Sequence, residues 1–240
     1  MNKTETKSIS GPIKLLQKSW SEYKANAKVF TLILIIPAFL ELLIKYVLVF
    51  VFKPASQDTE SSFFPLLLII FLAVLLVYIF ILFWSNTALY LSIVQKYSDW
   101  KGSYHKSLNK ILPLLFVNIL IAVLVSAGLI LLIIPGIILY VWLFLAPFVY
   151  LDQHKGGFSA LAKSKDLIKG YWWAVFLRGL FIFFVYFVIT ALFGMLTEAL
   201  RMPFSQSLIG IVLTPIALLY NFELYRELKV NHSHSSHHQD

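Results

Sequence analysis

The chain has 240 residues, of which 59% are hydrophobic and 13% are charged, and its formal net charge is +8. Soluble domains are about 45–50% apolar and about 25% charged, so this composition excludes an ordinary soluble fold and indicates a membrane protein. The absence of cysteine excludes disulfides, thiolate catalysis and cysteine-ligated metal.

Several apolar runs exceed the roughly 18 residues that indicate a membrane-spanning helix. They are continuous rather than alternating, which predicts an all-α, polytopic membrane bundle and not a β-barrel. We expect six spans, at residues 29–52, 63–91 (with a helical extension to 97), 111–134, 137–151, 171–196 and 205–224. The corresponding domains are an N-terminal segment 1–28 with an amphipathic helix, a membrane domain 29–226, and a disordered, histidine-rich tail 227–240.

Lysine and arginine crowd alternate connections between these spans. They gather before span one, between spans two and three, between spans four and five, and after span six. The positive-inside rule places such connections in the cytoplasm, so both termini are predicted to be cytoplasmic. The distribution indicates a multi-pass protein of the cell membrane, either the plasma membrane or the bacterial inner membrane. It also accounts for the basic charge without a nucleic-acid partner.

Three of the basic segments share a pattern, in which a short amphipathic helix leads directly into span one, three or five. We call each of these helices a foot. Each foot carries a Lys-Ser pair, and its apolar residues fall on one helical face. The pairs are Lys18-Ser19, Lys106-Ser107 and Lys163-Ser164. The predicted apolar faces are Leu16, Trp20, Tyr23 and Ala27, then Tyr104, Leu108, Ile111 and Leu115, and then Phe158, Leu161, Ala162 and Ile168.

The repetition predicts three units, each made of one foot and one helical hairpin. Lysines on a membrane-surface helix face anionic headgroups, so membrane lipids are the expected partners. Candidate headgroup contacts are Lys18, Lys106, Lys163 and Arg178. Two interpretations remain open: the feet only anchor and pack the spans, or they form a platform for lipid or a protein partner. The oligomeric state is left undetermined.

The apolar run around residues 131–147 contains a Pro135-Gly136 pair, which is a strong turn signal. Basic segments flank the run on both sides, so the chain has to cross the membrane and return within it. We therefore predict a tight, uncharged hairpin that turns at Pro135 and Gly136. Span four has about 15 residues, too short for the roughly 30 Å apolar core, so the tip is expected to stop below the outer surface.

Ionisable and amide groups inside the spans are costly in lipid and mark candidate functional positions. Glu41 and Lys45 are four residues apart and can pair on one helical face. With Asn118 and Glu223 they form a candidate intramembrane polar site. The alternative for Glu41 and Lys45 is an ion pair near the outer surface, and for Arg178 it is snorkelling to the headgroups.

We find no catalytic constellation, because no nucleophile with a base in reach and no metal-binding or phosphate-binding motif occurs. The sequence therefore predicts no catalytic residue, no cofactor and no structured metal site. The histidines of the tail lack defined ligand spacing.

Part of the chain resembles the glycerophosphoryl diester phosphodiesterase membrane-domain family and related bacterial and archaeal six-span proteins of unknown function. The matching residues are Ile134-Pro135-Gly136, Ala146-Pro147, a foot with Gly156 or Gly157, Ala160 and Ser164, then Gly170 with Trp172 or Trp173, and finally Pro215, Tyr225, Arg226 and Leu228. The resemblance implies the six-span fold and its topology. In some relatives a fused soluble domain carries the catalysis, and this sequence shows no such domain, so the resemblance implies no enzymatic activity.

Three functions are compatible with these observations. The first is a non-enzymatic scaffold or accessory protein in envelope or lipid homeostasis, acting through the basic feet. The second is a small transporter or channel, which the intramembrane polar residues and the proline-interrupted spans at Pro37, Pro147 and Pro215 would suit. The third is a lipid-modifying enzyme. The first is favoured.

Overall fold

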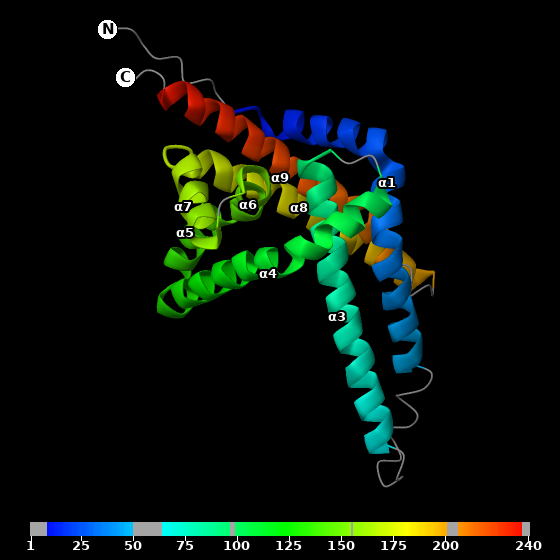
Figure 1. The fold of residues 1–240 in the computed structure, drawn as a ribbon. Helices are drawn as coiled ribbons and strands as arrows, with labels where there is room; N and C mark the ends of the chain where they lie inside the picture. Colours follow the sequence, from blue (N-terminus) through cyan, green and yellow to red (C-terminus); the bar gives the residue numbers. More distant parts are fainter. Residues whose placement is uncertain (1–8, 50–63, 97–98, 155, 201–205, 237–240) are drawn as a thin grey trace, which may run out of the picture.

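The computed structural model describes residues 9–49, 64–96, 99–154, 156–200 and 206–236. These residues form helices and no strand, and six helical stretches are long and apolar enough to cross a membrane. The all-α, multi-span prediction is confirmed at this level. The helices are α1 (Pro12–Val47), α3 (Phe64–Val94), α4 (Trp100–Leu131), α5 (Ile133–Leu143), α6 (Ala146–Gln153), α7 (Gly157–Ile168), α8 (Trp172–Ala199) and α9 (Gln206–Ser236) (Figure 1).

Two of the three predicted feet are not separate helices. The first foot forms the opening turns of α1, and the second forms the opening turns of α4. Only the third, α7, stands apart from the helix that follows, because the link to α8 contains Gly170 with a φ of +88°. Glycine adopts this left-handed conformation without the steric cost that a side chain would bring.

The reversal between α4 and α5 lies at Leu132, so the prediction that the chain turns at Pro135 and Gly136 is wrong. Leu132 is the extended residue between the two helices, with φ −163° and ψ 148°. Pro135 lies in the first turn of α5, where its missing N–H leaves no helical hydrogen bond unmade. Gly136 follows it and permits close packing, because a Cβ there would lie 2.8 Å from the backbone nitrogen of Leu129.

The hairpin of α4 and α5 is short and ends in apolar side chains. Helix α5 has 11 residues, which corresponds to about 16 Å at 1.5 Å per residue. From Ile130 to Ile134 every side chain is apolar, and each is between 68% and 86% exposed. The tip is therefore apolar and uncharged, and its position below the outer surface of the bilayer stays a prediction.

Span four is divided in the structure. Helix α5 ends at Leu143 and α6 begins at Ala146, so Phe144 and Leu145 separate them. Pro147 lies in the first turn of α6 and cannot donate to the carbonyl four residues earlier. The proline therefore explains why one apolar stretch gives two helices.

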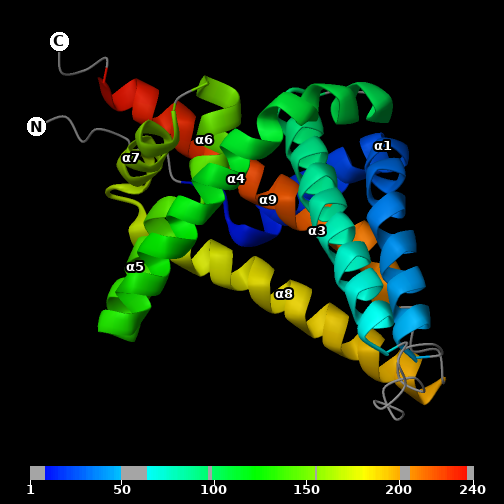
Figure 2. The ribbon, with the colours of Figure 1, turned by 60° about the horizontal axis from the view of Figure 1, so that its bottom comes forward.

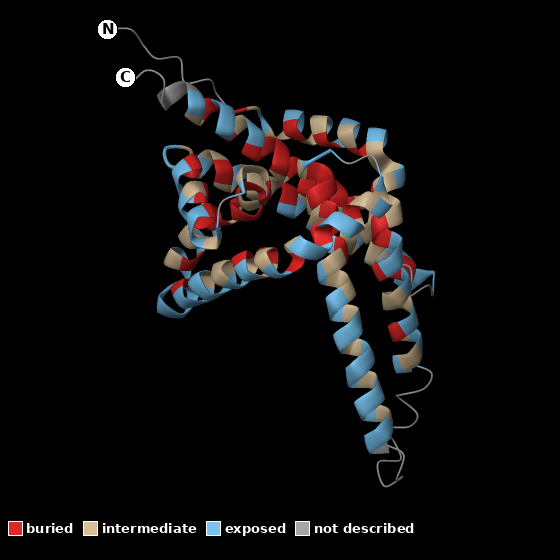
Figure 3. Cartoon of the chain, viewed as in Figure 1, coloured by how far each residue is buried: buried red, intermediate tan, exposed pale blue. Residues whose placement is uncertain are grey.

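One end of the molecule carries most of the lysines, and we call it the basic end. It contains the first turns of α1 and α4, the last turns of α3 and α9, and helices α6 and α7 (Figure 1). Buried residues concentrate here, around the second half of α9 (Figure 3). Away from this core, the α4–α5 hairpin diverges from α3 and α8 (Figure 2).

The predicted disorder of the tail 227–240 is wrong for residues 227–236. Helix α9 continues to Ser236, and Leu228 is fully buried within the core. Glu227 also hydrogen-bonds to the start of the chain, and these contacts stabilise the helix beyond the apolar span. The rest of the predicted tail, residues 237–240, lies outside the described residues.

Candidate functional site

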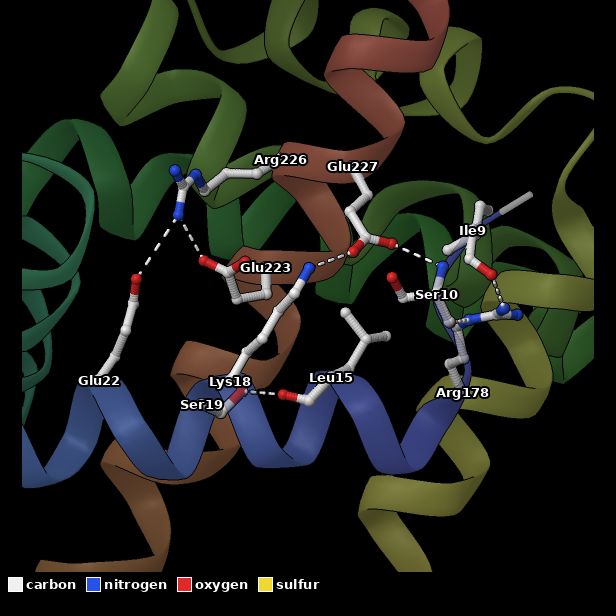
Figure 4. Close-up of polar contacts among 10 residues, drawn as sticks. All are labelled: Ile9, Ser10, Leu15, Lys18, Ser19, Glu22, Arg178, Glu223, Arg226 and Glu227. Carbon is white, nitrogen blue, oxygen red and sulfur yellow. Dashed lines mark hydrogen bonds and ion pairs between the residues drawn. The ribbon is translucent and has the colours of Figure 1, made fainter. Parts of the chain in front are cut away.

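Ile9 and Ser10, the first residues that the structure describes, are held against α8 and α9 by two charged side chains (Figure 4). The guanidinium of Arg178 donates to the carbonyl of Ser10 from Nε at 2.8 Å, and to that of Ile9 from Nη2 at 2.7 Å. The carboxylate of Glu227 accepts the N–H of Ser10 at 2.8 Å and the ammonium of Lys18 at 2.7 Å. We call Ile9, Ser10, Lys18, Arg178 and Glu227 the terminal clamp.

The terminal clamp gives Arg178 and Lys18 partners that the sequence could not indicate. The Nη1 of Arg178 donates to the carbonyl of Ala174 at 2.8 Å, so all three nitrogens of the guanidinium bind backbone carbonyls. Lys18 binds a carboxylate of the same chain. Of the other candidate headgroup residues, Lys106 is exposed and Lys163 is half-buried. Contact of these four side chains with headgroups stays a prediction.

Beside the clamp, Arg226 joins two carboxylates. Its Nη1 lies 2.5 Å from Glu223 and 3.6 Å from Glu22. One turn of α9 further on, the ammonium of Lys229 lies 2.5 Å from the carboxylate of Asp152. The hydroxyl of Tyr225 donates to the same carboxylate oxygen at 2.6 Å. These ion pairs join α1, α6 and α9 at the basic end.

The candidate intramembrane polar residues do not form one site. Glu41 and Lys45 pair with each other on α1. Asn118 lines a cavity of about 310 Å³ between α3 and α4, where its amide donates to the carbonyl of Leu114. Glu223 belongs to the ion pairs of the basic end. These separate locations contradict the predicted single site, because each polar group is satisfied by a neighbour close to it.

The serines of the three Lys-Ser pairs occupy equivalent, fully buried positions. Ser19, Ser107 and Ser164 each have 0% exposure, and their hydroxyls donate to the carbonyls of Leu15, Tyr104 and Trp142. The residues four before and four after each serine are buried as well. They are Leu15 and Tyr23, Ser103 and Ile111, and Ala160 and Ile168.

The three feet therefore share a packing face centred on a small residue, which supports the predicted threefold repeat. Trp20, Leu108 and Phe158 of the predicted apolar faces are exposed, as side chains that dip into the acyl boundary would be, so their contact with lipid stays a prediction. The small serine lets the foot approach its neighbours closely, and its hydroxyl is satisfied within the fold.

An apolar groove of about 500 Å³ runs between α1, α8 and α9. The foot of α1 supplies one wall, through Leu16, Gln17 and Trp20, and α8 and α9 supply the others. Their residues are Ile182, Val185, Tyr186, Ile189, Val212, Leu213, Ile216 and Ala217. The ammonium of Lys24 lies 6.0 Å from the ring centre of Trp20. Basic and polar side chains of the foot thus border an apolar groove.

A neighbouring cavity of about 320 Å³ lies between α5, α8 and α9. It shares Ile182, Tyr186 and Ala217 with the groove. Its walls are aromatic and aliphatic, except for Asn221, whose Oδ1 is buried and has no hydrogen-bond partner within the described chain. The two hollows therefore lie next to each other along α8 and α9. Sequence reasoning missed both, because their walls come from segments far apart in the chain.

Comparison with known proteins adds no relative: no family model, no curated protein and no solved structure matches the chain. These comparisons do not bear on the family resemblance seen in the sequence.

Proposed function

We propose that this protein is a non-enzymatic membrane scaffold that binds phospholipid and acts in envelope or lipid homeostasis. The single observation that carries the proposal is the groove between α1, α8 and α9, bordered by the basic foot of α1. In a bilayer, lipid chains are what is available to fill a hollow lined by apolar side chains. We place the basic end in the cytoplasm, in agreement with the positive-inside rule.

The border of the groove suits an anionic headgroup. Gln17 offers amide donors, and Lys24 offers an ammonium one turn beyond Trp20 on the same helix. A tryptophan at this level combines an apolar ring with a polar N–H, as side chains at membrane interfaces do. The acyl chain would lie along α8 and α9, with its phosphate near the foot.

Native mass spectrometry of the full chain, purified in a mild detergent, tests this proposal. The wild type is expected to retain phospholipid after delipidation. Ala217→Trp, which fills the groove and the adjacent cavity, should lose most of it. Ala73→Trp is the matched control, because Ala73 is an exposed residue of α3 outside both hollows.

Two results would overturn the proposal. One is a wild type that retains no phospholipid. The other is equal retention by Ala217→Trp and the wild type. A third outcome is a dimer that carries no lipid and that Ala217→Trp dissociates. That result would show that a second copy of the chain occupies the groove.

A further inference from the structure

A further hollow, of about 540 Å³, lies at the basic end between the end of α3, α6 and the last turns of α9. We call it the basic cavity. Three cationic side chains line it, Lys96, Arg226 and Lys229, together with one carboxylate, Asp152. Gln95, Tyr225 and Ser233 add further polar groups. Its volume falls within the range of about 300–1,000 Å³ that small-molecule sites occupy.

Arg226 is fixed along one edge and free to donate along the other. Its Nη1 is held by Glu223 and Glu22, and Figure 4 shows the other guanidinium nitrogens turned away from both carboxylates. Within the described chain, those nitrogens make no hydrogen bond. A guanidinium presents its donors in a planar fork that matches two oxygens of a phosphate. The two glutamates therefore position Arg226 for an anionic ligand.

Lys96 approaches the cavity from a different element. It lies two residues after the end of α3 in the left-handed conformation, with a φ of 52°, and lines the cavity together with Arg226 and Lys229 from α9. Within the part of the chain that the structure describes, Lys96 forms no ion pair. The turn after α3 and helix α9 thus bring cationic groups to one hollow.

The carboxylate in the lining is already paired within the chain. Asp152 accepts from both Lys229 and Tyr225, so its own charge is compensated by a neighbouring cation and a hydroxyl. Asp152 thus holds Lys229, and Tyr225 holds Asp152.

Glu22 and Glu223 offset the charge of Arg226, and Lys96 acts electrostatically on Glu22. An anion would therefore be bound by hydrogen-bond donors, the outer edge of the Arg226 guanidinium and the ammonium of Lys96, and not by a net positive charge.

We propose that the basic cavity binds the phosphate group of a phosphorylated ligand, which is either a soluble phosphate ester or the headgroup of a membrane lipid. Arg226 would bind two phosphate oxygens, and Lys96 would supply a further hydrogen-bond donor. This site is separate from the groove that carries the proposed function, and it stands on different residues.

Isothermal titration calorimetry on the detergent-purified full chain tests the proposal, with inorganic phosphate and glycerol 3-phosphate as probes. Lys96→Gln and Arg226→Gln are each expected to lower the affinity about tenfold or more, because each removes a charged hydrogen-bond donor. Arg226→Lys should also weaken binding, since it keeps the charge and loses the fork. Lys101→Gln is the control, with the same change of charge at an exposed residue outside the cavity.

A second arm identifies the source of the phosphate. The same variants are placed in nanodiscs of phosphatidylcholine with or without phosphatidic acid, and lipid retention is measured. Binding of the soluble probes, or of phosphatidic acid alone, supports the site and names its source. No binding in either arm, or an equal loss in Lys101→Gln, overturns the proposal. Ala217→Trp should leave phosphate binding unchanged, so failure of the groove and failure of this cavity remain distinguishable.

Discussion

The hydroxyl of Tyr104 donates a 2.7 Å hydrogen bond to the carbonyl of Ile33, on a helix 71 residues earlier in the chain. This carbonyl needs an outside donor because Pro37, four residues after Ile33 within α1, has no N–H to give it. The same hydroxyl lies 2.7 Å from the hydroxyl of Ser85 on α3. Tyr104 therefore joins α4 to α1 and α3 at the position where α1 lacks a helical hydrogen bond.

Tyr104→Phe should destabilise the protein by about 1–3 kcal/mol, because it leaves the buried carbonyl of Ile33 and the hydroxyl of Ser85 without partners. Thermal unfolding in detergent measures the effect. Tyr140→Phe is the matched control, since the Tyr140 hydroxyl makes no hydrogen bond within the described residues and the side chain is exposed. Equal melting temperatures for the two variants would contradict the proposed role of Tyr104.

Replacing Pro37 should reduce the importance of Tyr104. In Pro37→Ala, the new N–H at position 37 can donate to the carbonyl of Ile33. The cost of Tyr104→Phe is therefore expected to be smaller in a Pro37→Ala background than in the wild type. A double-mutant cycle measures this coupling. If the two substitutions proved additive, the hydroxyl would not be compensating for the proline.

The features that the sequence predicted well are those set by local composition. Apolar run length indicated the six long apolar helices. The adjacent residues Lys18 and Ser19 and their two counterparts suggested a repeat, which stays a prediction. The lysines of these pairs were predicted to contact lipid. In the structure, the three serines are the residues that share a fully buried position. The burial of the serines was not predicted, because a serine next to a lysine is usually found on a polar surface. Their burial depends on neighbouring helices.

Contacts between distant segments could not be predicted in this way. Arg178 and Ser10 are separated by 168 residues, and nothing local to either one points to the other. The prediction for the end of α9 was wrong for a related reason. Its polar composition suggested disorder. The fold supplies the partners that keep it helical, Lys18 and Ser10 for Glu227 and the surrounding core for Leu228.

Gly136→Ala should destabilise the α4–α5 hairpin by about 1–3 kcal/mol, the usual cost of overfilling a packed site. An added Cβ would lie 2.4 Å from Cδ2 of Leu129 and 2.8 Å from its backbone nitrogen. Gly210→Ala is the control, because a Cβ at Gly210 meets nothing within 4 Å. Comparison of the two melting temperatures tests the packing, and an unchanged value for Gly136→Ala would show that the helices can separate freely.

Ser164→Leu should destabilise the contact between α7 and α5, because the serine is fully buried and donates 2.7 Å to the carbonyl of Trp142. The larger side chain overfills the site and leaves that carbonyl without its donor, at a cost of about 2–4 kcal/mol. Ala162→Leu, at an exposed position of the same helix, provides the control. A smaller loss of stability in Ser164→Leu than in Ala162→Leu would contradict the packing role of the serine.

Arg178→Lys should release Ile9 and Ser10 from α8 and leave the helices packed together. A lysine keeps the charge, but it cannot donate in fixed directions to the carbonyls of Ile9 and Ser10 and to that of Ala174 at once. Hydrogen–deuterium exchange, followed by mass spectrometry of peptides covering residues 9–18, is expected to show faster exchange at Ser10, whose N–H now donates to Glu227.

The control for this experiment is Arg226→Lys, the same substitution on α9 at an arginine that contacts Glu22 and Glu223 and not the N-terminal segment. Exchange in residues 9–18 should match the wild type in this variant. If Arg178→Lys also exchanged like the wild type, Glu227 alone would be sufficient to hold the segment. Faster exchange only in Arg178→Lys would show that the bond between Ser10 and Glu227 depends on the arginine, since the two side chains hold the same residue from opposite sides (Figure 4).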